Sequence, residues 1–161
     1  LAGRELAHPI MLAPVAFQRL AHEQGEWASA VAAAAQGAGI VLASLSSVPM
    51  EDVAQAYLPD KGRGLLWFQL YWQAERSSNL ALIERAEAAG FEAIVLTVDA
   101  PVQGVRDAER RAAFSLPPGI HAVHLPTTAQ ARLDHVRGGS RRVSLPTLPF
   151  NTELLITCTD C

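Results

Sequence analysis

Two pairs of polar side chains stand at the ends of apolar runs in this sequence. Thr97 and Asp99 follow the run "AIVL", and Gln69 and Tyr71 end the run "LLWFQLY". Because side chains two apart on a strand point to the same side, each pair shares one face. An amide, two hydroxyls and a carboxylate gathered at one end of a sheet can bind and orient a polar ligand.

Two further apolar runs also end in small or polar residues. The run "PIMLAPVAF" contains Pro14, which stiffens a turn and is followed by small side chains that leave backbone amides reachable. The run "IVLASL" leads into Ser44, Ser46 and Ser47. Each residue alone has an ordinary structural explanation, since Asp99 before Ala-Pro could simply cap a turn. Their recurrence at four consecutive run ends favours a ligand site.

Charged and metal-binding candidates lie further along the chain. In "VRDAERRAAF", Arg110 and Arg111 fit a solvated helix face, whereas Arg106 lies closest to the preceding run and could bind an anionic substrate with its guanidinium fork. His121 and His124 have a spacing suited to a metal on a helix. Neighbouring Pro and Gly residues argue against that helix, so no metal site is expected.

The apolar runs alternate with alanine-rich amphipathic runs, which predicts strands alternating with helices. In the third expected helix, Ser77 or Ser78 is the expected N-cap and Gly90 the C-terminal stop. Such alternation means parallel strands joined by right-handed crossovers. An open doubly wound sheet and a (β/α) barrel both fit this α/β plan, and both place ligands at the C-terminal strand ends. The expected strands cover 9–14, 40–45, 64–71 and 92–101, and the expected helices cover 23–39, 50–57 and 77–90.

The sequence changes character after Phe114. This part is rich in Pro, Gly, Ser, Thr and Arg and shows no sustained period, which predicts a long loop or a poorly ordered tail. The run "ELLITC" near the end could form one more strand. The expected division is therefore residues 1–119 as the α/β unit and residues 120–161 as an irregular tail.

Composition narrows the class of protein. The chain has 161 residues and a formal net charge of −3, which argues against a nucleic-acid or membrane-surface partner. Its apolar runs are too short to span a bilayer, and its start lacks the layout of a secretory signal. The two cysteines, Cys158 and Cys161, form a lone CxxC at the end. The rest of the chain has no cysteine, so no disulfide framework holds the fold. A cytoplasmic location is therefore the expectation.

Several of these stretches together resemble the FMN-dependent α-hydroxy-acid oxidase and dehydrogenase family. They are "PIMLAPVAFQRLAHEQGEWASAVAAAAQGAG", "WFQLY", "AEAAGFEAIVLTVDAPVQGVRDAERR" and "FSLPPG", which run in order from about residue 9 to residue 119. The resemblance implies a TIM (β/α)8 barrel with FMN at its C-terminal mouth, of which residues 1–119 would supply the first four βα units. It implies an enzyme that oxidises a small 2-hydroxy acid, such as lactate or glycolate, to the 2-oxo acid.

The same resemblance implies roles for individual residues. Tyr71 would contact the substrate, Asp99 would orient and charge-stabilise a histidine base, and Arg106 would lie over the active site. The backbone of the first loop would lie against the flavin ring, and polar side chains from the next three strands would bind the flavin's polar edge. The implied cofactor-binding residues are Pro14, Val15, Ala16, Ser44, Gln69 and Thr97.

The family's second half has no match in this sequence. A motif like "HGGRQ", which carries the catalytic histidine and the substrate-binding arginine, is missing, and "VRGGSRRV" has only its glycines. Four parallel strands cannot close a barrel and leave two open edges, so a homo-oligomer or a partner carrying the missing half is expected. The alternative is a non-catalytic truncated half-barrel that self-associates or pairs with a partner.

Overall fold

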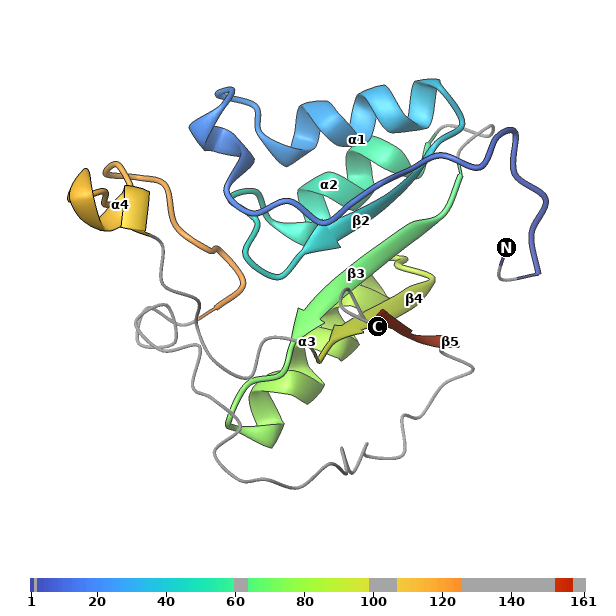
Figure 1. The fold of residues 1–161 in the computed structure, drawn as a ribbon. Coiled ribbons are helices and arrows are strands. Elements are labelled where there is room, and N and C mark those ends of the chain that lie inside the picture. The colour runs from blue at the N-terminus through green and yellow to red at the C-terminus, as the bar shows by residue number, and fades with distance from the viewer. Residues whose placement is uncertain (2, 60–63, 99–106, 126–152, 158–161) are drawn as a thin grey trace.

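The computed structural model describes residues 1, 3–59, 64–98, 107–125 and 153–157 (Figure 1). Strands and helices alternate along them as the hydrophobic pattern predicts. The strands are β1 (Met11–Leu12), β2 (Gly39–Ala43), β3 (Leu66–Tyr71), β4 (Ala93–Thr97) and β5 (Glu153–Thr157). The helices are α1 (Glu26–Ala35), α2 (Met50–Tyr57), α3 (Arg76–Ala88) and α4 (Asp107–Arg111), with a 3₁₀ turn, η1, at Gln18–Leu20.

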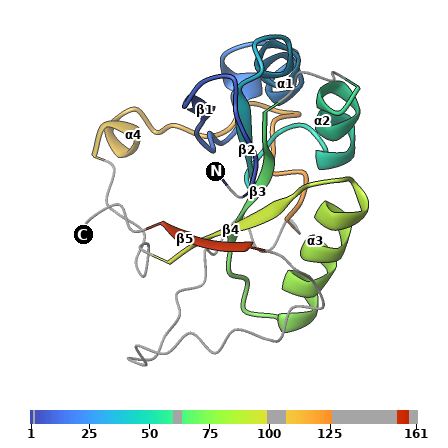
Figure 2. The ribbon, with the colours of Figure 1, turned by 90° about the vertical axis from the view of Figure 1, so that its right-hand side faces the viewer.

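The strands form one parallel sheet in the order β1-β2-β3-β4-β5. The sheet curves, and α1, α2 and α3 all lie along one of its faces (Figure 2). The run "ELLIT" pairs with β4 over five residues, which confirms the extra strand expected near the end of the chain. Among the described strands β1 and β5 have one neighbour each, so the sheet has two outer strands.

Side chains of β3 alternate between the two faces of the sheet. Leu66 and Phe68 pack in the main core with the helices, whereas Trp67 belongs to a second apolar cluster on the opposite face. By the same alternation Gln69 and Tyr71 lie on the Trp67 face. The helix-free face of the sheet is therefore apolar along most of its length and polar at the C-terminal strand ends. Both clusters exclude water, and their burial stabilises the fold.

Two glycines allow the chain to turn tightly between elements. Gly90 follows α3 with φ of +92°, which confirms it as the C-terminal stop of that helix. Gly64 packs so closely before β3 that an added Cβ would lie 2.5 Å from the Ala38 carbonyl carbon and the Gly39 nitrogen. At Gly64 the close approach of two backbone segments excludes any side chain.

The expected N-cap of α3 is wrong. The helix begins at Arg76, one residue before the two serines, and Glu75 at the cap position makes no side-chain cap hydrogen bond. Buried Asn79 instead ties the segment before the helix to its first turn. Its Oδ1 accepts from the Gln73 nitrogen at 2.8 Å, and its Nδ2 donates to the Gln73 and Glu75 carbonyls at 2.8 and 3.0 Å. An amide that both donates and accepts satisfies more of this turn than a serine hydroxyl would.

No helix in the described part of the chain is long and apolar enough to cross a membrane.

Candidate functional site

Hydrogen bonds join the C-terminal ends of β2, β3 and β4 through the side chain of Gln69. Its Nε2 donates to Thr97 Oγ1 at 2.9 Å. Its Oε1 accepts from the Ser44 backbone nitrogen at 3.2 Å and from Ser44 Oγ at 3.3 Å. Gln69 and Ser44 are buried, and Thr97 is half-buried. The structure thus brings together three of the residues that the sequence analysis proposed as cofactor contacts. We refer to Ser44, Gln69 and Thr97 as the strand-end cluster.

Tyr71 lies beside this cluster at the end of β3. Its backbone nitrogen donates to Ser44 Oγ at 3.3 Å, and it stands opposite Thr97 in the pairing of β3 with β4. Alternation along β3 places the half-buried Tyr71 side chain on the same face as Gln69. An aromatic hydroxyl and the polar cluster therefore share one face at the same end of the sheet.

The loop after β1 lies next to the loop after β2. Pro14 and Val15 are exposed and Ala16 is half-buried, so this loop offers backbone and small side chains at the surface. The Phe17 nitrogen donates to the Leu45 carbonyl at 3.1 Å, which ties the two loops together. Phe17 does so with φ of +51°, in the left-handed region that a bulky residue rarely adopts. Such a conformation persists only where surrounding contacts hold it.

A buried carboxylate that the sequence analysis did not single out fixes these two loops. Glu26, the first residue of α1, is fully buried. Its Oε1 accepts from the backbone nitrogens of Gln18 at 3.0 Å and Ser47 at 2.9 Å, and its Oε2 accepts from Ser47 Oγ at 2.8 Å. Ser47 Oγ in turn accepts from the Arg19 nitrogen at 3.1 Å. The only sequence signal for this role is an acidic residue in the first turn of a helix, a common surface feature.

Ser46 and Ser47 do not join the strand-end cluster. Ser46 Oγ donates to the Val48 carbonyl at 2.9 Å, within its own loop, and Ser47 serves Glu26. Both serines are buried, and their hydroxyls are used in bonds that shape the loop. Of the serines after β2, Ser44 alone contacts Gln69 among the described residues.

The remaining catalytic candidates, Asp99 and Arg106, lie outside the described residues. Helix α4 begins directly after that stretch, and its Arg110 and Arg111 are exposed, as a solvated helix face requires. Arg110 lies 3.6 Å from the Asp107 carboxylate, one turn away along the same short helix.

The two histidines of "HAVH" lie in different surroundings. His121 is exposed, while His124 is buried and packs edge-on against Phe68, with ring centroids 5.8 Å apart. Burial, helped by the positive charge of Arg85, lowers the pKa of His124 from 6.5 to about 4. Turns at 118–119 and 123–124 flank and enter this stretch, and no helix covers residues 120–125. In the described part of the chain no three His, Cys, Asp or Glu side chains gather closely enough to bind a metal.

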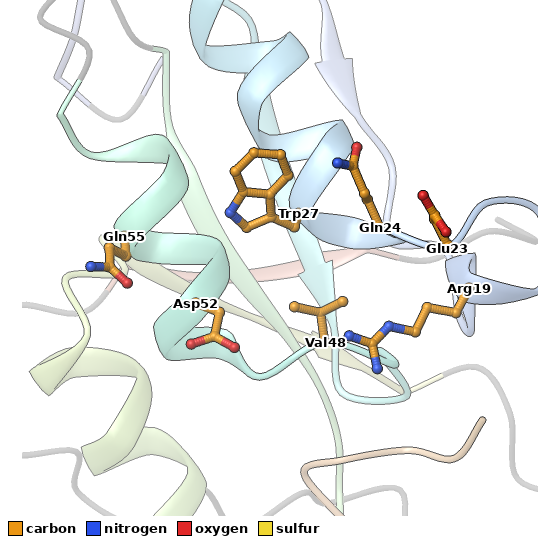
Figure 3. A pocket seen from close by; sticks show the side chains of 7 residues that line it. All are labelled: Arg19, Glu23, Gln24, Trp27, Val48, Asp52 and Gln55. Atoms are coloured by element: carbon orange, nitrogen blue, oxygen red, sulfur yellow. The ribbon is translucent and has the colours of Figure 1, made fainter. Parts of the chain in front are cut away.

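An open hollow of about 520 Å³ lies on the outer surface between η1, α1 and α2 (Figure 3). Arg19, Trp27 and Asp52 are among the residues that line it. None of the strand-end cluster lines this hollow, which lies among helices rather than at the strand ends. The hollow and the candidate site are therefore separate features.

Known proteins resemble most of this chain. The family model described as FMN-dependent dehydrogenase matches residues 1–145. An L-lactate oxidase of Nostoc sp. is 47% identical over 141 residues, which cover 86% of this chain and 38% of the relative. A glycolate oxidase of Spinacia oleracea is 43% identical over 118 residues, which cover 73% of this chain and 31% of the relative.

Solved structures show the same similarity in three dimensions. A mandelate oxidase with bound (S)-2-phenylpropionate matches 78% of this chain and 36% of its own, with a TM-score of 0.71 and 43% identity. This confirms the expected first half of a TIM barrel. The chain spans about a third of the length of the relatives it matches. The chain belongs to the FMN-dependent dehydrogenase family.

Proposed function

We propose that this chain provides the flavin-binding strand ends of an FMN-dependent oxidoreductase that oxidises a small 2-hydroxy acid to the 2-oxo acid. The observation that carries the proposal is the strand-end cluster, in which Gln69 joins Ser44 and Thr97 at the C-terminal edge of the sheet. Relatives named lactate oxidase, glycolate oxidase and 4-hydroxymandelate oxidase support the substrate class, because all three names denote 2-hydroxy acids.

The residues present fit the ring system of FMN. A flat heteroaromatic ring with a polar edge needs hydrogen-bonding groups along that edge and a smooth surface against its face. Gln69 and Thr97 offer an amide and a hydroxyl 2.9 Å apart, at the ends of neighbouring strands. Pro14, Val15 and Ala16 offer a loop without long side chains. When bound, FMN supplies the two-electron acceptor that the oxidation requires.

The chain's own residues would bind and orient the substrate. Oxidation of a 2-hydroxy acid removes a hydride from the carbon and a proton from the hydroxyl, leaving the carbonyl. Tyr71 would hold the substrate from the β3 end, and Arg106 would pair with its carboxylate. Asp99 would stabilise the protonated form of the histidine that takes the hydroxyl proton. By the family resemblance that histidine lies in the part of the relatives that this chain does not span.

We infer that the active form contains more than one such chain or a complementary half. The two outer strands, β1 and β5, have one neighbour each among the described strands, and unpaired strand edges invite further pairing. Ile10 and Leu12, at the β1 edge, are 60% and 37% exposed. A cytoplasmic location and a small-molecule substrate complete the proposal.

Flavin binding tests the proposal directly. The purified chain is incubated with FMN and passed through a gel-filtration column, and the visible absorbance of the protein peak is recorded. We expect a retained flavin spectrum that Gln69→Ala and Thr97→Ala abolish. Ser46→Ala should preserve it, since the Ser46 hydroxyl bonds to the Val48 carbonyl within its own loop. A folded chain that passes FMN unbound would refute flavin binding by this chain and would favour a non-catalytic half-barrel.

The substrate class is tested in a second assay. A flavin-loaded sample is mixed with lactate, glycolate or mandelate, and bleaching of the flavin absorbance is followed without oxygen. The control is the same acid without its 2-hydroxy group. Bleaching by the hydroxy acid and not by this control would support oxidation of the 2-hydroxy acid. Absence of bleaching by all three acids in a sample that retains FMN would show that the reaction needs the histidine and other residues of the complementary half.

A further inference from the structure

The side-chain amide of Gln69 is held in one orientation. The Ser44 backbone N–H can only donate, so the Gln69 atom 3.2 Å from it must be the carbonyl oxygen. Ser44 Oγ reaches the same oxygen at 3.3 Å. The NH₂ group must then face the other way, toward Thr97 Oγ1 at 2.9 Å. The orientation follows from donor and acceptor chemistry at both ends of the amide.

Ser44 has no hydrogen-bond donor left for a ligand. Its N–H and its hydroxyl proton both go to Gln69 Oε1, and its oxygen accepts from the Tyr71 backbone nitrogen at 3.3 Å. The residue is fully buried, with a relative exposure of 0%. In this structure Ser44 directs both of its donors to Gln69, whereas the sequence-based expectation for Ser44 is a direct flavin contact.

We propose that Ser44 is a positioning residue that makes the strand-end cluster a hydrogen-bond donor site. The NH₂ group of Gln69 carries two protons. One goes to Thr97 Oγ1, and the other remains for a ligand. Thr97 Oγ1 accepts from Gln69, so its own proton is available to another acceptor. Two protons, one from N–H and one from O–H, thus remain at neighbouring strand ends. The chemistry they recognise is a pair of acceptors, such as a carbonyl oxygen and a ring nitrogen or a second carbonyl oxygen.

The identity of the ligand rests on the proposed function. If FMN binds here, its acceptor atoms rather than its ring N–H meet this cluster. Donors aimed at those atoms stabilise negative charge that develops on the ring system when it takes up electrons. The orientation of Gln69 would then contribute to the cofactor's affinity, and Ser44 would do so without touching it.

The loop offers a matched pair of variants. Ser44→Ala removes one of two donors to Gln69 Oε1 and leaves the Tyr71 nitrogen without its acceptor. Ser46→Ala removes an equally buried hydroxyl from the same loop, whose bond goes to the Val48 carbonyl. A general effect of losing a buried serine hydroxyl would appear in both variants. An effect through Gln69 would appear only in the first.

The primary measurement is made on the flavin-free protein. In ¹⁵N-resolved NMR spectra we expect the Gln69 side-chain protons to show contacts with Thr97 and not with the Ser44 amide proton. We expect Ser44→Ala to speed exchange of those protons with water about tenfold, the factor that loss of one net hydrogen bond gives. Ser46→Ala should leave the exchange rate within about twofold of the unsubstituted chain.

Contacts from the Gln69 NH₂ to the Ser44 amide proton would overturn the proposal in the unsubstituted chain, even if Ser44→Ala failed to fold. Equal exchange rates in a folded Ser44→Ala variant would overturn it as well. Flavin titration is the second readout, and we expect Ser44→Ala to raise the FMN dissociation constant about tenfold. An unsubstituted chain that binds no FMN would refute the proposed function, while the amide measurement would still decide the role of Ser44.

Discussion

Replacing Glu26 by alanine should destabilise the fold more than any exposed substitution on α1. The change removes the acceptor of three donors: the Gln18 nitrogen, the Ser47 nitrogen and the Ser47 hydroxyl, at 3.0, 2.9 and 2.8 Å. A buried donor left without a partner costs about 1–3 kcal/mol, and three donors lose their acceptor here, while removal of the buried carboxylate returns part of that cost. We therefore expect a loss of about 3–5 kcal/mol in the free energy of unfolding.

Glutamine at the same position should be much milder. Its Oε1 can still accept from both backbone nitrogens. Its Nε2 can donate to the lone pair of Ser47 Oγ that the Arg19 nitrogen does not use, although the Ser47 hydroxyl proton then loses its acceptor. The loss is then the charge-assisted part of the bonds and the favourable interaction of a carboxylate with the N-terminus of α1, together about 1–2 kcal/mol. Comparing the two variants separates the contribution of the hydrogen bonds to stability from the contribution of the charge.

Urea unfolding followed by circular dichroism measures both losses. The Ala variant should unfold at lower urea with an unchanged m-value, since the same surface is exposed on unfolding. Amide exchange at Phe17 and Arg19 should quicken in the same variant, because Glu26 and Ser47 hold the loop between β1 and α1. A loss below about 1 kcal/mol for alanine, or equal losses for alanine and glutamine, would refute the hydrogen-bond account of Glu26.

Three further predictions concern the core. Gly64→Ala should prevent stable folding, measured by circular dichroism, because its Cβ would lie 2.5 Å from backbone atoms. Tyr57→Phe should cost about 1–2 kcal/mol in urea unfolding, because the buried hydroxyl donates to the Ala38 carbonyl at 2.6 Å; no loss would contradict that bond. Stability should fall by about 3 kcal/mol as the pH drops from about 6.5 to about 4, because unfolded His124 binds a proton that the folded residue excludes. The His124→Phe variant should lose the part of this pH dependence that His124 causes. If its stability depends on pH as the unsubstituted chain's does, the assignment to His124 is refuted.

The sequence alone was sufficient for the alternation of the elements. Buried strands such as β3 and β4 appear as short apolar runs, and the alanine-rich helices between them end at glycine, because burial and helix termination are properties of a few neighbouring residues. Their alternation predicts a parallel sheet, and the parallel sheet predicts a ligand site at its C-terminal edge. Helix α2 has the predicted bounds, Met50–Tyr57. The family resemblance then selected the barrel from the two architectures that the pattern allowed.

Only the tertiary structure decided which polar residues serve the site and which serve the fold. Ser44 and Ser47 lie three residues apart and look alike in sequence, yet one orients Gln69 and the other binds Glu26. Gln69 and Thr97 are 28 positions apart, and their hydrogen bond exists because β3 and β4 pair in one particular register. Hydrogen-bond partners are set by distances of a few tenths of an ångström between segments far apart in the chain, and local patterns carry no information about those distances.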